Sequence, residues 1–431
     1  MTPRVYWRRI EGDGVRPNRP AARGADDPYR VTGRGFVLWG WRRPVDPLAI
    51  AVVAALLILA ASMLAVELGV SVALLEMSLG VVAGNLLGLR SPPWMDFLAS
   101  FGSLVLTFLA GAEVDPQVMR EKLKESLLIG GLSFLAPFVG AWAFCAAVLG
   151  WPPAAAQIAG VALSTTSLAV VYAVLVETGL THTPLGKLLM ASTFVTDFGT
   201  AAALSALFVR PTGWLVPFGA AAAAIVWGMR ALQPWFFRRY GARVIEPEIK
   251  GAFAALLVLM FFAERAQSHA VLPAFVLGLA LAPVFHRHPD LQRRFRVVAF
   301  ALLTPCFFLK GGMHVSLPLV TANLGPLLLL FGIKLGAKFA GVYPLARRYV
   351  SRDAMFTTLL MSTGLTFGTI SALYGLTAGL LDRVQFSVLV AVVVASAIVP
   401  TVIAQRWFPP TPRSVSPTPA PARPLQEPDA P

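Results

Sequence analysis

Long apolar stretches, most of them close to 20 residues, repeat along almost the whole chain and are separated by short segments with proline, glycine or charged residues. A helix of about 20 apolar residues spans the hydrocarbon core of a bilayer. The pattern therefore predicts an all-α membrane protein with about 13 transmembrane helices. We expect these helices near residues 48–68, 70–89, 95–113, 125–149, 154–177, 185–208, 214–233, 250–266, 269–285, 296–315, 323–345, 354–379 and 383–405.

Neither end of the chain has periodic apolar residues. Residues 1–47 are polar and rich in arginine, and residues 406–431 are rich in proline and alanine. Such segments bury too little apolar surface to offset the entropy lost on folding. We therefore expect a disordered tail at each end and one transmembrane domain over residues 48–405.

Two of the predicted helices are polar in their middle. The span 154–177 contains Ser-Thr-Thr-Ser at 164–167, and the span 354–379 contains a Ser/Thr/Gly-rich segment at 362–371. If the span 214–233 is a linker, each polar segment lies in the fifth helix of a unit of six, and the odd number of spans in unit plus linker inverts the second unit. Backbone that unwinds at membrane depth needs partners from protein or cavity water. We therefore predict two inverted six-helix repeats whose broken fifth helices cross near the middle of the bilayer.

Asp197 is the main candidate for chemistry. It lies about 12 residues into an apolar segment that begins near Leu185, which at 1.5 Å per residue places it roughly 18 Å deep. A carboxylate at that depth costs at least a few kcal/mol and by default marks a path for an ion or a proton. The alternative is an acid that is paired with a neighbouring helix for packing alone.

Lys334 and Lys338 lie one helical turn apart on one face of the span 323–345. Neither is at a helix end, so reaching the membrane surface is harder than for a terminal lysine, although the two could extend to opposite interfaces. One hypothesis is that Lys338 pairs with Asp197 and that an entering cation breaks the pair, with release of a proton. The other is a purely structural ion pair. Because the ends of broken helices carry partial charges, Asp197 and a lysine are also candidates for compensating them.

Lys310 and Glu264 form a second candidate pair. Lys310 lies within the span 296–315, and Glu264 lies near the end of the span 250–266. They either pair across the fold or, in the simpler interpretation, reach water at opposite interfaces. Glu113 lies close to the end of a span, and we interpret it as an interfacial residue rather than an ion ligand.

Composition supports a membrane protein, and charge gives its orientation. The 431 residues are 56% hydrophobic and 13% charged, and the mean hydropathy is +0.69. A net charge of +14 would suggest nucleic acid as the partner of a soluble chain, but the positive residues fall in alternate gaps, at 230–250, 287–296 and 347–352. Positive gaps face the cytoplasm. We therefore expect no nucleic-acid partner, and a multi-pass protein of a bacterial inner (plasma) membrane with a cytoplasmic C-terminus, although Arg42 and Arg43 would then lie on the disfavoured side.

No motif indicates an enzyme or a cofactor. The chain offers no catalytic triad, phosphate-binding loop or haem motif in a credible context. Cys145 and Cys306 lie far apart in apolar segments, so neither a disulfide framework nor a transition-metal site is predicted. Carboxylate, hydroxyl and carbonyl oxygens are instead the hard ligands that suit alkali cations.

Six short segments, in this order along the chain, resemble the monovalent cation:proton antiporter superfamily, in its second branch with the sodium/hydrogen exchanger domain. They are FLAGAEVD at 108–115, STTSLAVV at 164–171, FVTDFG at 194–199, PAFVLGLA at 273–280, PCFFLKGGM at 305–313 and AKFAG at 337–341. The resemblance covers about residues 48–405. It implies a core domain with crossed broken helices, a separate dimerisation domain and hence a homodimer in the lipid bilayer, and an elevator-like movement that exposes one site alternately.

The resemblance also assigns roles to individual residues. Asp197 matches the essential aspartate that binds the ion and the proton, and Thr165, Thr166 and Ser167 match the broken helix beside it. Lys338 matches the lysine that pairs with this aspartate in electrogenic members. Two positions depart from the family.

Thr196 stands where electrogenic relatives have a second aspartate and electroneutral ones often have Asn or Gln, and Lys310 stands where the residue is commonly uncharged. A single carboxylate favours one cation for one proton, whereas Lys338 favours electrogenic exchange, so the stoichiometry stays open.

The leading hypothesis is a secondary antiporter that exchanges Na⁺ or K⁺ for H⁺ at Asp197, with Thr196, Thr165, Thr166 and Ser167 as neighbouring oxygen donors. A sodium-coupled symporter of an organic anion on a similar inverted-repeat fold is the alternative. A channel, or a membrane sensor that has lost transport, is a third hypothesis. Sequence does not separate Na⁺ from K⁺, because selectivity depends on cavity size and ligand number.

Overall fold

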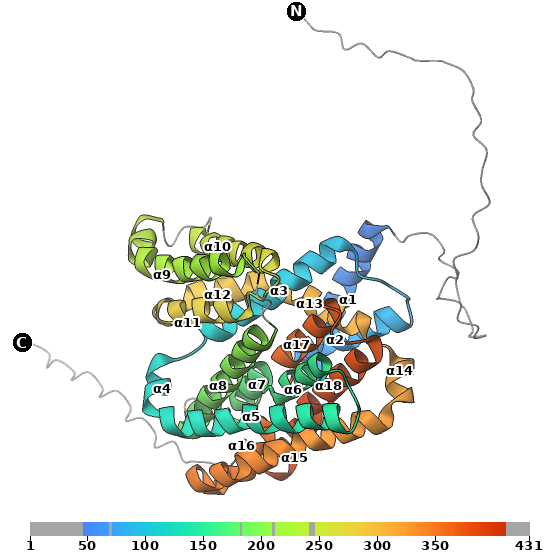
Figure 1. Ribbon diagram of the computed structural model, residues 1–431. Helices are drawn as coiled ribbons and strands as arrows, with labels where there is room; N and C mark the ends of the chain where they lie inside the picture. Colours follow the sequence, from blue (N-terminus) through green and yellow to red (C-terminus); the bar gives the residue numbers. More distant parts are fainter. Residues whose placement is uncertain (1–45, 69–70, 182, 209–211, 241–245, 411–431) are drawn as a thin grey trace, which may run out of the picture. The chain divides into compact units, whose positions relative to one another are not determined.

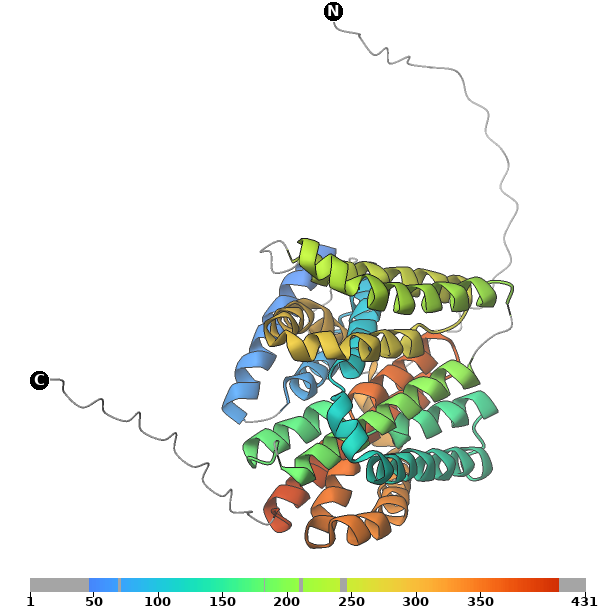
Figure 2. The ribbon, with the colours of Figure 1, turned by 90° about the vertical axis from the view of Figure 1, so that its left-hand side faces the viewer.

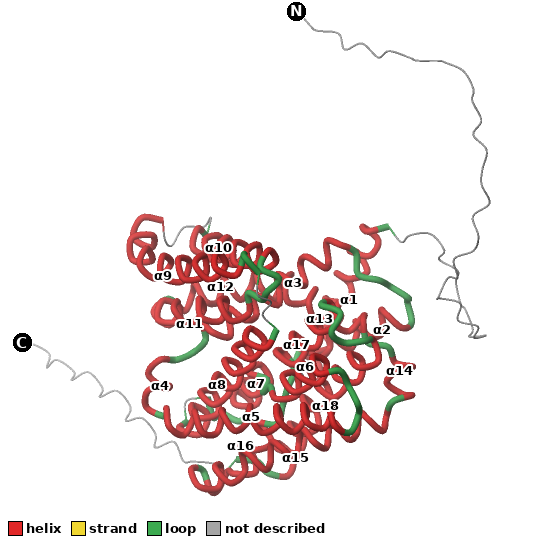
Figure 3. Tube along the Cα trace, in the orientation of Figure 1, coloured by secondary structure: helices red, strands yellow, loops and turns green. Residues whose placement is uncertain are grey.

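The structure is a computed structural model that describes residues 46–68, 71–181, 183–208, 212–240 and 246–410. Within these ranges the chain forms helices joined by loops and has no β-strand (Figure 3). The all-helical class predicted from the apolar pattern is therefore confirmed. The two predicted tails, including Arg42 and Arg43, lie outside the described residues except at their inner ends.

Eight helices make up the first half of the chain (Figure 1). They are α1 (Pro47–Leu68), α2 (Val72–Asn85), α3 (Pro93–Ala112), α4 (Pro116–Glu121), α5 (Leu123–Ala147), α6 (Pro153–Ser164), α7 (Leu168–Glu177) and α8 (Pro184–Leu207). The predicted linker is α9 (Leu215–Tyr240), which runs beside α10 in Figure 2.

The second half begins with α10 (Pro247–Arg265) and α11 (Val271–Arg287). It continues with α12 (Pro289–Val298), which leads through a π-helical turn at Ala299–Leu303 into α13 (Thr304–His314). The remaining helices are α14 (Leu317–Ala322), α15 (Leu324–Tyr349), α16 (Ala354–Met361), α17 (Thr366–Thr377) and α18 (Arg383–Trp407), with a 3₁₀ turn at Ser351–Asp353 before α16.

Each predicted span coincides with a helix or with two consecutive helices. Ten segments of the described chain are long and apolar enough to cross a membrane, and α2 and α11 are shorter apolar helices. The multi-pass architecture is therefore confirmed, whereas the number of 13 crossings stays a prediction. α1 has an exposed apolar face: Leu48, Val52, Leu56, Leu59 and Met63 are all more than half exposed and recur every three or four residues, which places them on one face of the helix.

Packing between the two halves is reciprocal. α3 packs on α11, and α2 packs on α13. A Cβ atom on Gly111 of α3 would meet the Phe275 carbonyl of α11, and one on Gly278 of α11 would meet the Phe108 carbonyl of α3. Glycine at both positions lets the helices approach closely, as small residues do in membranes. Because the second helix of each unit packs on the third of the other, the pairing has the symmetry expected of two repeated units.

Both predicted broken helices are present. α6 ends at Ser164 and α7 begins at Leu168, while α16 ends at Met361 and α17 begins at Thr366. α6 packs against α17, and α5 and α15 lie side by side next to the broken helices (Figure 1). The fold therefore brings four helix ends together inside the protein.

Candidate functional site

The two interrupted segments are joined by hydrogen bonds where they cross. The Thr166 hydroxyl donates to the Met361 carbonyl at 2.9 Å, and the Ser167 amide donates to the Thr363 hydroxyl at 3.4 Å. Ser167 also caps α7, because its hydroxyl accepts from the Val170 amide at 3.5 Å. The side chains at the breaks thus provide partners for backbone groups that no longer bond within a helix.

Lys338 binds to hydroxyl groups at this crossing. Its Nζ donates to Ser133 Oγ of α5 at 2.8 Å and to Thr166 Oγ1 at 3.0 Å. Because Thr166 passes its own hydrogen to the Met361 carbonyl, the ammonium is linked through one hydroxyl to the C-terminal end of α16. A positive charge is stabilising at a helix C-terminus. Sequence reasoning missed Ser133, which is an ordinary small residue within the apolar pattern of α5.

Lys334 occupies a second buried position at the crossing. Its side chain is fully buried, and its Nζ has no hydrogen-bond partner among the described residues. A Cβ atom on Gly364 would meet this Nζ and also the hydroxyl and carbonyl of Thr165. Lys334 therefore lies beside the residue that follows α6, in space that is available because residue 364 is glycine.

Asp197 lies in the middle of α8 and is 1% exposed. Its Oδ1 atom has no hydrogen-bond partner, and its carboxylate forms no ion pair with the described residues. The pairing of Asp197 with Lys338 considered from the sequence is thus not formed in this conformation, because Lys338 is bound to hydroxyls from α5 and the α6–α7 break. The Thr196 hydroxyl donates to the Thr193 carbonyl at 2.7 Å.

A cavity of about 220 Å³ contains Asp197. It is lined by the first residues of the two helices that follow the breaks, Leu168 and Ala169 of α7 and Thr366 and Phe367 of α17. Helix N-termini carry partial positive charge and favour an anion. The carboxylate is therefore held near the positive ends of two helices and remains open to a ligand. Thr196 is buried and does not line this cavity.

Glu113 and Arg296 line the same cavity and form an ion pair. Arg296 donates to Glu113 Oε1 through Nε at 3.0 Å and through Nη2 at 2.5 Å. Glu113 follows α3, and Arg296 lies in the last turn of α12. Sequence reasoning treated Glu113 as interfacial, although it lies within the FLAGAEVD segment that carries the resemblance.

Lys310 and Glu264 line a different and larger cavity, of about 510 Å³. Lys310 forms its ion pair with Asp96 Oδ1 at 2.8 Å, not with Glu264, which corrects the pairing considered from the sequence. The reason is packing, because α13 lies directly on α3, whose first turn carries Asp96. This cavity is lined by α3 residues between Ala99 and Leu104, whereas the cavity of Asp197 is lined by residues between Leu106 and Glu113, so the two cavities follow one another along α3.

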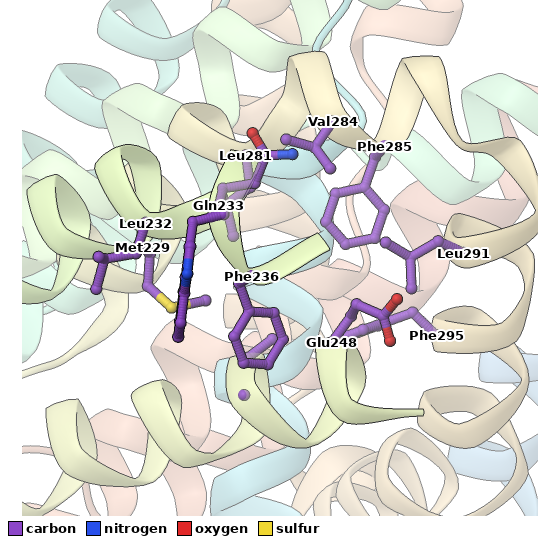
Figure 4. Close-up of a pocket in the computed structure, with 13 residues that line it drawn as sticks. Met229, Leu232, Gln233, Phe236, Glu248, Leu281, Val284, Phe285, Leu291 and Phe295 are labelled. Carbon is purple, nitrogen blue, oxygen red and sulfur yellow. The ribbon is translucent and has the colours of Figure 1, made fainter. Parts of the chain in front are cut away.

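A third cavity, of about 270 Å³, lies between α9, α10, α11 and α12 (Figure 4). Phe236, Phe285 and Phe295 surround it, and Gln233 and Glu248 are its polar residues. It shares no lining residue with the cavity of Asp197. In the described part of the chain, no three His, Cys, Asp or Glu side chains cluster as transition-metal ligands would. Oxygen donors around Asp197 are the groups suited to a hard monovalent cation.

Comparison with known proteins identifies relatives of this site and fold. A family model described as "Sodium/hydrogen exchanger, transmembrane" matches residues 51–408. The chain is 27% identical over 375 residues to the Na(+)/H(+) antiporter NhaS4 of Synechocystis, covering 78% of this chain and 90% of that protein. It is 24% identical over 352 residues to the Na(+)/H(+)-K(+) antiporter GerN of Bacillus cereus, covering 78% of this chain and 89% of that protein.

A solved structure has the same fold. The sodium proton antiporter MjNhaP1 from Methanocaldococcus jannaschii superposes with a TM-score of 0.62 at 15% sequence identity, over 83% of this chain and 95% of that chain. The alternative of a sodium-coupled symporter of an organic anion finds no support in these similarities.

Proposed function

This chain belongs to the family of transmembrane sodium/hydrogen exchangers, and we propose that it exchanges a monovalent cation, Na⁺ or K⁺, for H⁺ by alternating access at Asp197. One observation carries the proposal: Asp197 is buried, has an oxygen without a partner and opens onto a cavity at the N-termini of two half-helices. The names of NhaS4 and GerN support exchange of Na⁺, and that of GerN also supports K⁺.

Competition for one carboxylate couples the two fluxes. Ionised Asp197 binds the cation, and protonation of the same group expels it, so cation and proton are never carried together. Thr165, Thr166 and Ser167 supply hydroxyl and carbonyl oxygens at the adjacent break, and Thr196 supplies a hydroxyl next to Asp197 in the chain. Hard oxygen donors of this kind replace the hydration shell of an alkali cation.

The two lysines compensate helix ends in this proposal. Lys338 serves the C-terminus of α16 through Thr166, and Lys334 lies beside the C-terminus of α6 at Thr165. Because neither lysine is ion-paired with Asp197 in this conformation, the carboxylate stays available to its ligand. The two cavities along α3 then serve as the two access routes, and movement of the broken helices exposes Asp197 to each in turn.

Orientation follows from the arginine-rich gaps. Arg296 belongs to the gap 287–296 and lines the cavity of Asp197. We assign that gap to the cytoplasm, so this conformation faces inward, and the C-terminus is cytoplasmic in a bacterial inner membrane. We also assign a homodimer within the lipid bilayer.

Proteoliposomes with an internal pH dye test the proposal. Addition of Na⁺ or K⁺ should alkalinise or acidify the lumen according to the imposed gradient, and Asp197→Asn should abolish the signal while the purified variant keeps its oligomeric state. A clamped membrane potential separates electroneutral from electrogenic exchange. Proton movement that persists in Asp197→Asn, or that neither cation drives, would remove Asp197 from the mechanism.

A further inference from the structure

Glu113 is the second carboxylate on the cavity that contains Asp197. Of the described residues that line this cavity, Glu113 and Asp197 are the acidic ones and Arg296 is the basic one. When both carboxyl groups are ionised, two carboxylates and one guanidinium leave a net negative charge in this cavity, which attracts cations. Thr196 does not line the cavity, so the second acidic side chain that a cation can meet there is Glu113.

Glu113 also lies where two cavities meet. Besides the cavity of Asp197, it lines one of about 200 Å³ that includes Asp115, Lys187 and His286. Its side chain is 17% exposed, between the 1% exposure of Asp197 and the 39% exposure of the Arg296 side chain. Glu113 is therefore intermediate in exposure between Arg296 and Asp197, and it lines a cavity with both.

The ion pair of Glu113 is built so that it can open. Both bonds from Arg296 go to a single oxygen, Oε1. The Arg296 side chain is more than a third exposed, so water can take over its hydrogen bonds when the pair separates. Opening the pair therefore does not leave Arg296 as an uncompensated buried charge.

We propose that Glu113 is a capture ligand for the transported cation, which displaces Arg296 from its carboxylate before it moves on to Asp197. The inference rests on the proposed function. Arg296 competes with the cation for Glu113, and thereby limits how tightly the cation is held on its way to the buried site. Among the described residues, the charged or titratable groups that line a cavity with Glu113 are Arg296 from α12, His286 from α11, Lys187 and Asp197 from α8, Tyr172 from α7, and Asp115 after α3.

Substitutions of the two partners should change cation affinity in opposite directions. Glu113→Gln should raise the half-saturating Na⁺ or K⁺ concentration about tenfold, because a charged ligand is lost. Arg296→Gln should lower the half-saturating concentration, because the competitor for Glu113 is gone. The double variant should behave as Glu113→Gln does.

Asp115→Asn is the matched control, because it removes the same charge two residues away without touching the cavity of Asp197. It should leave the half-saturating concentration within twofold of the unsubstituted value. Thermal unfolding of each purified variant verifies folding.

A purely structural ion pair would make Glu113→Gln and Arg296→Gln alike, with lower thermal stability and the same direction of change in transport. That result, or an unchanged half-saturating concentration in Glu113→Gln, would overturn the inference. Exchange that depends on Asp197 but not on Glu113 would leave the proposed function standing, whereas absence of exchange in the unsubstituted protein would count against the proposed function itself.

Discussion

The crossing of the broken helices has an acidic side and a basic side. On the acidic side, Asp197 shares a cavity with the first residues of α7 and α17. On the basic side, Lys338 is linked to the last carbonyl of α16, and Lys334 lies beside Thr165 after α6. The same helix dipole thus explains an acid where two helices begin and two bases where two helices end.

Access to a cavity separates the two sides, and hydrogen bonding separates Lys338 from Asp197. Lys338 has two hydroxyl acceptors within 3.0 Å, whereas Asp197 Oδ1 has no partner among the described residues. Asp197 lines a cavity, and neither lysine lines any of the cavities described above. Lys338 therefore has the bonding of a structural residue, while Asp197 has an oxygen that is free to bind an exchangeable ligand.

Asp197→Asn should have the largest effect on transport. It should abolish cation-driven proton movement without lowering the melting temperature, because it removes a buried charge that has no protein partner. Sodium at about 100 times its dissociation constant should stabilise the unsubstituted protein by about 2.7 kcal/mol. The variant should show no such shift in thermal unfolding. An equal sodium-dependent shift in both proteins would place the cation elsewhere.

Lys338→Met should instead lower the stability of the protein. The hydroxyls of Ser133 and Thr166 lose a charged donor, so unfolding should be easier by about 2–3 kcal/mol, and the melting temperature should fall even without cation. Lys122→Met, at a half-exposed lysine 3.9 Å from Glu125, is the control and should melt normally. A normal melting temperature for Lys338→Met would mean that the basic side is not structural.

Gly364→Ala tests whether Lys334 occupies the space beside residue 364. The added methyl group would meet Lys334 Nζ and Thr165, and an overpacked interior costs about 1–3 kcal/mol. Gly336→Ala is the matched control, because a Cβ atom there meets nothing within 4 Å and alanine favours helix by about 1 kcal/mol. Thermal unfolding should therefore shift down for the first and slightly up for the second. Equal shifts would show that Lys334 does not fill the space at residue 364.

Thr196→Val should have the smallest effect. The hydroxyl donates to the Thr193 carbonyl in this conformation, so its oxygen can offer the cation only a weak additional bond. We expect the half-saturating cation concentration to rise about threefold, which corresponds to the net free energy of one weak hydrogen bond. A concentration-dependence measurement in proteoliposomes gives the value. Loss of transport in this variant would make Thr196 a primary ligand and would weaken the contrast between the two sides.

Much of the fold could be predicted from the sequence, for a simple reason. In a bilayer, apolar runs near 20 residues must be helices, so the predicted spans coincide with helices of the structure. The Ser/Thr/Gly segments at 164–167 and 362–371 interrupt this apolar pattern, and each of them contains a break in a helix. α9 extends to Tyr240, beyond the predicted end near residue 233, because the helix continues through Pro234 into a last turn with Arg238 and Arg239, where proline and charge had marked the end of the apolar run.

Pairings of individual side chains could not be predicted in the same way. Glu113 and Arg296 are 183 positions apart, and Lys338 and Ser133 are 205 apart. Which groups meet depends on how each helix is rotated about its axis and on where it packs, and a spacing pattern in one chain does not contain either quantity. For this reason the sequence left a pairing of Lys310 with Glu264 and of Lys338 with Asp197 only as possibilities, whereas the structure pairs Lys310 with Asp96 and binds Lys338 to hydroxyls.

The sequence by itself therefore determined that this is a helical membrane protein with two broken helices and a buried aspartate, because the bilayer penalises every departure from an apolar helix and makes each one visible. The tertiary structure alone decided that Asp197 shares a cavity with two helix N-termini and with Glu113, and that Lys338 and Lys334 lie beside Thr166 and Thr165. These relations arise from packing between distant segments. Rotation of a helix by a fraction of a turn would give a charged side chain a different partner.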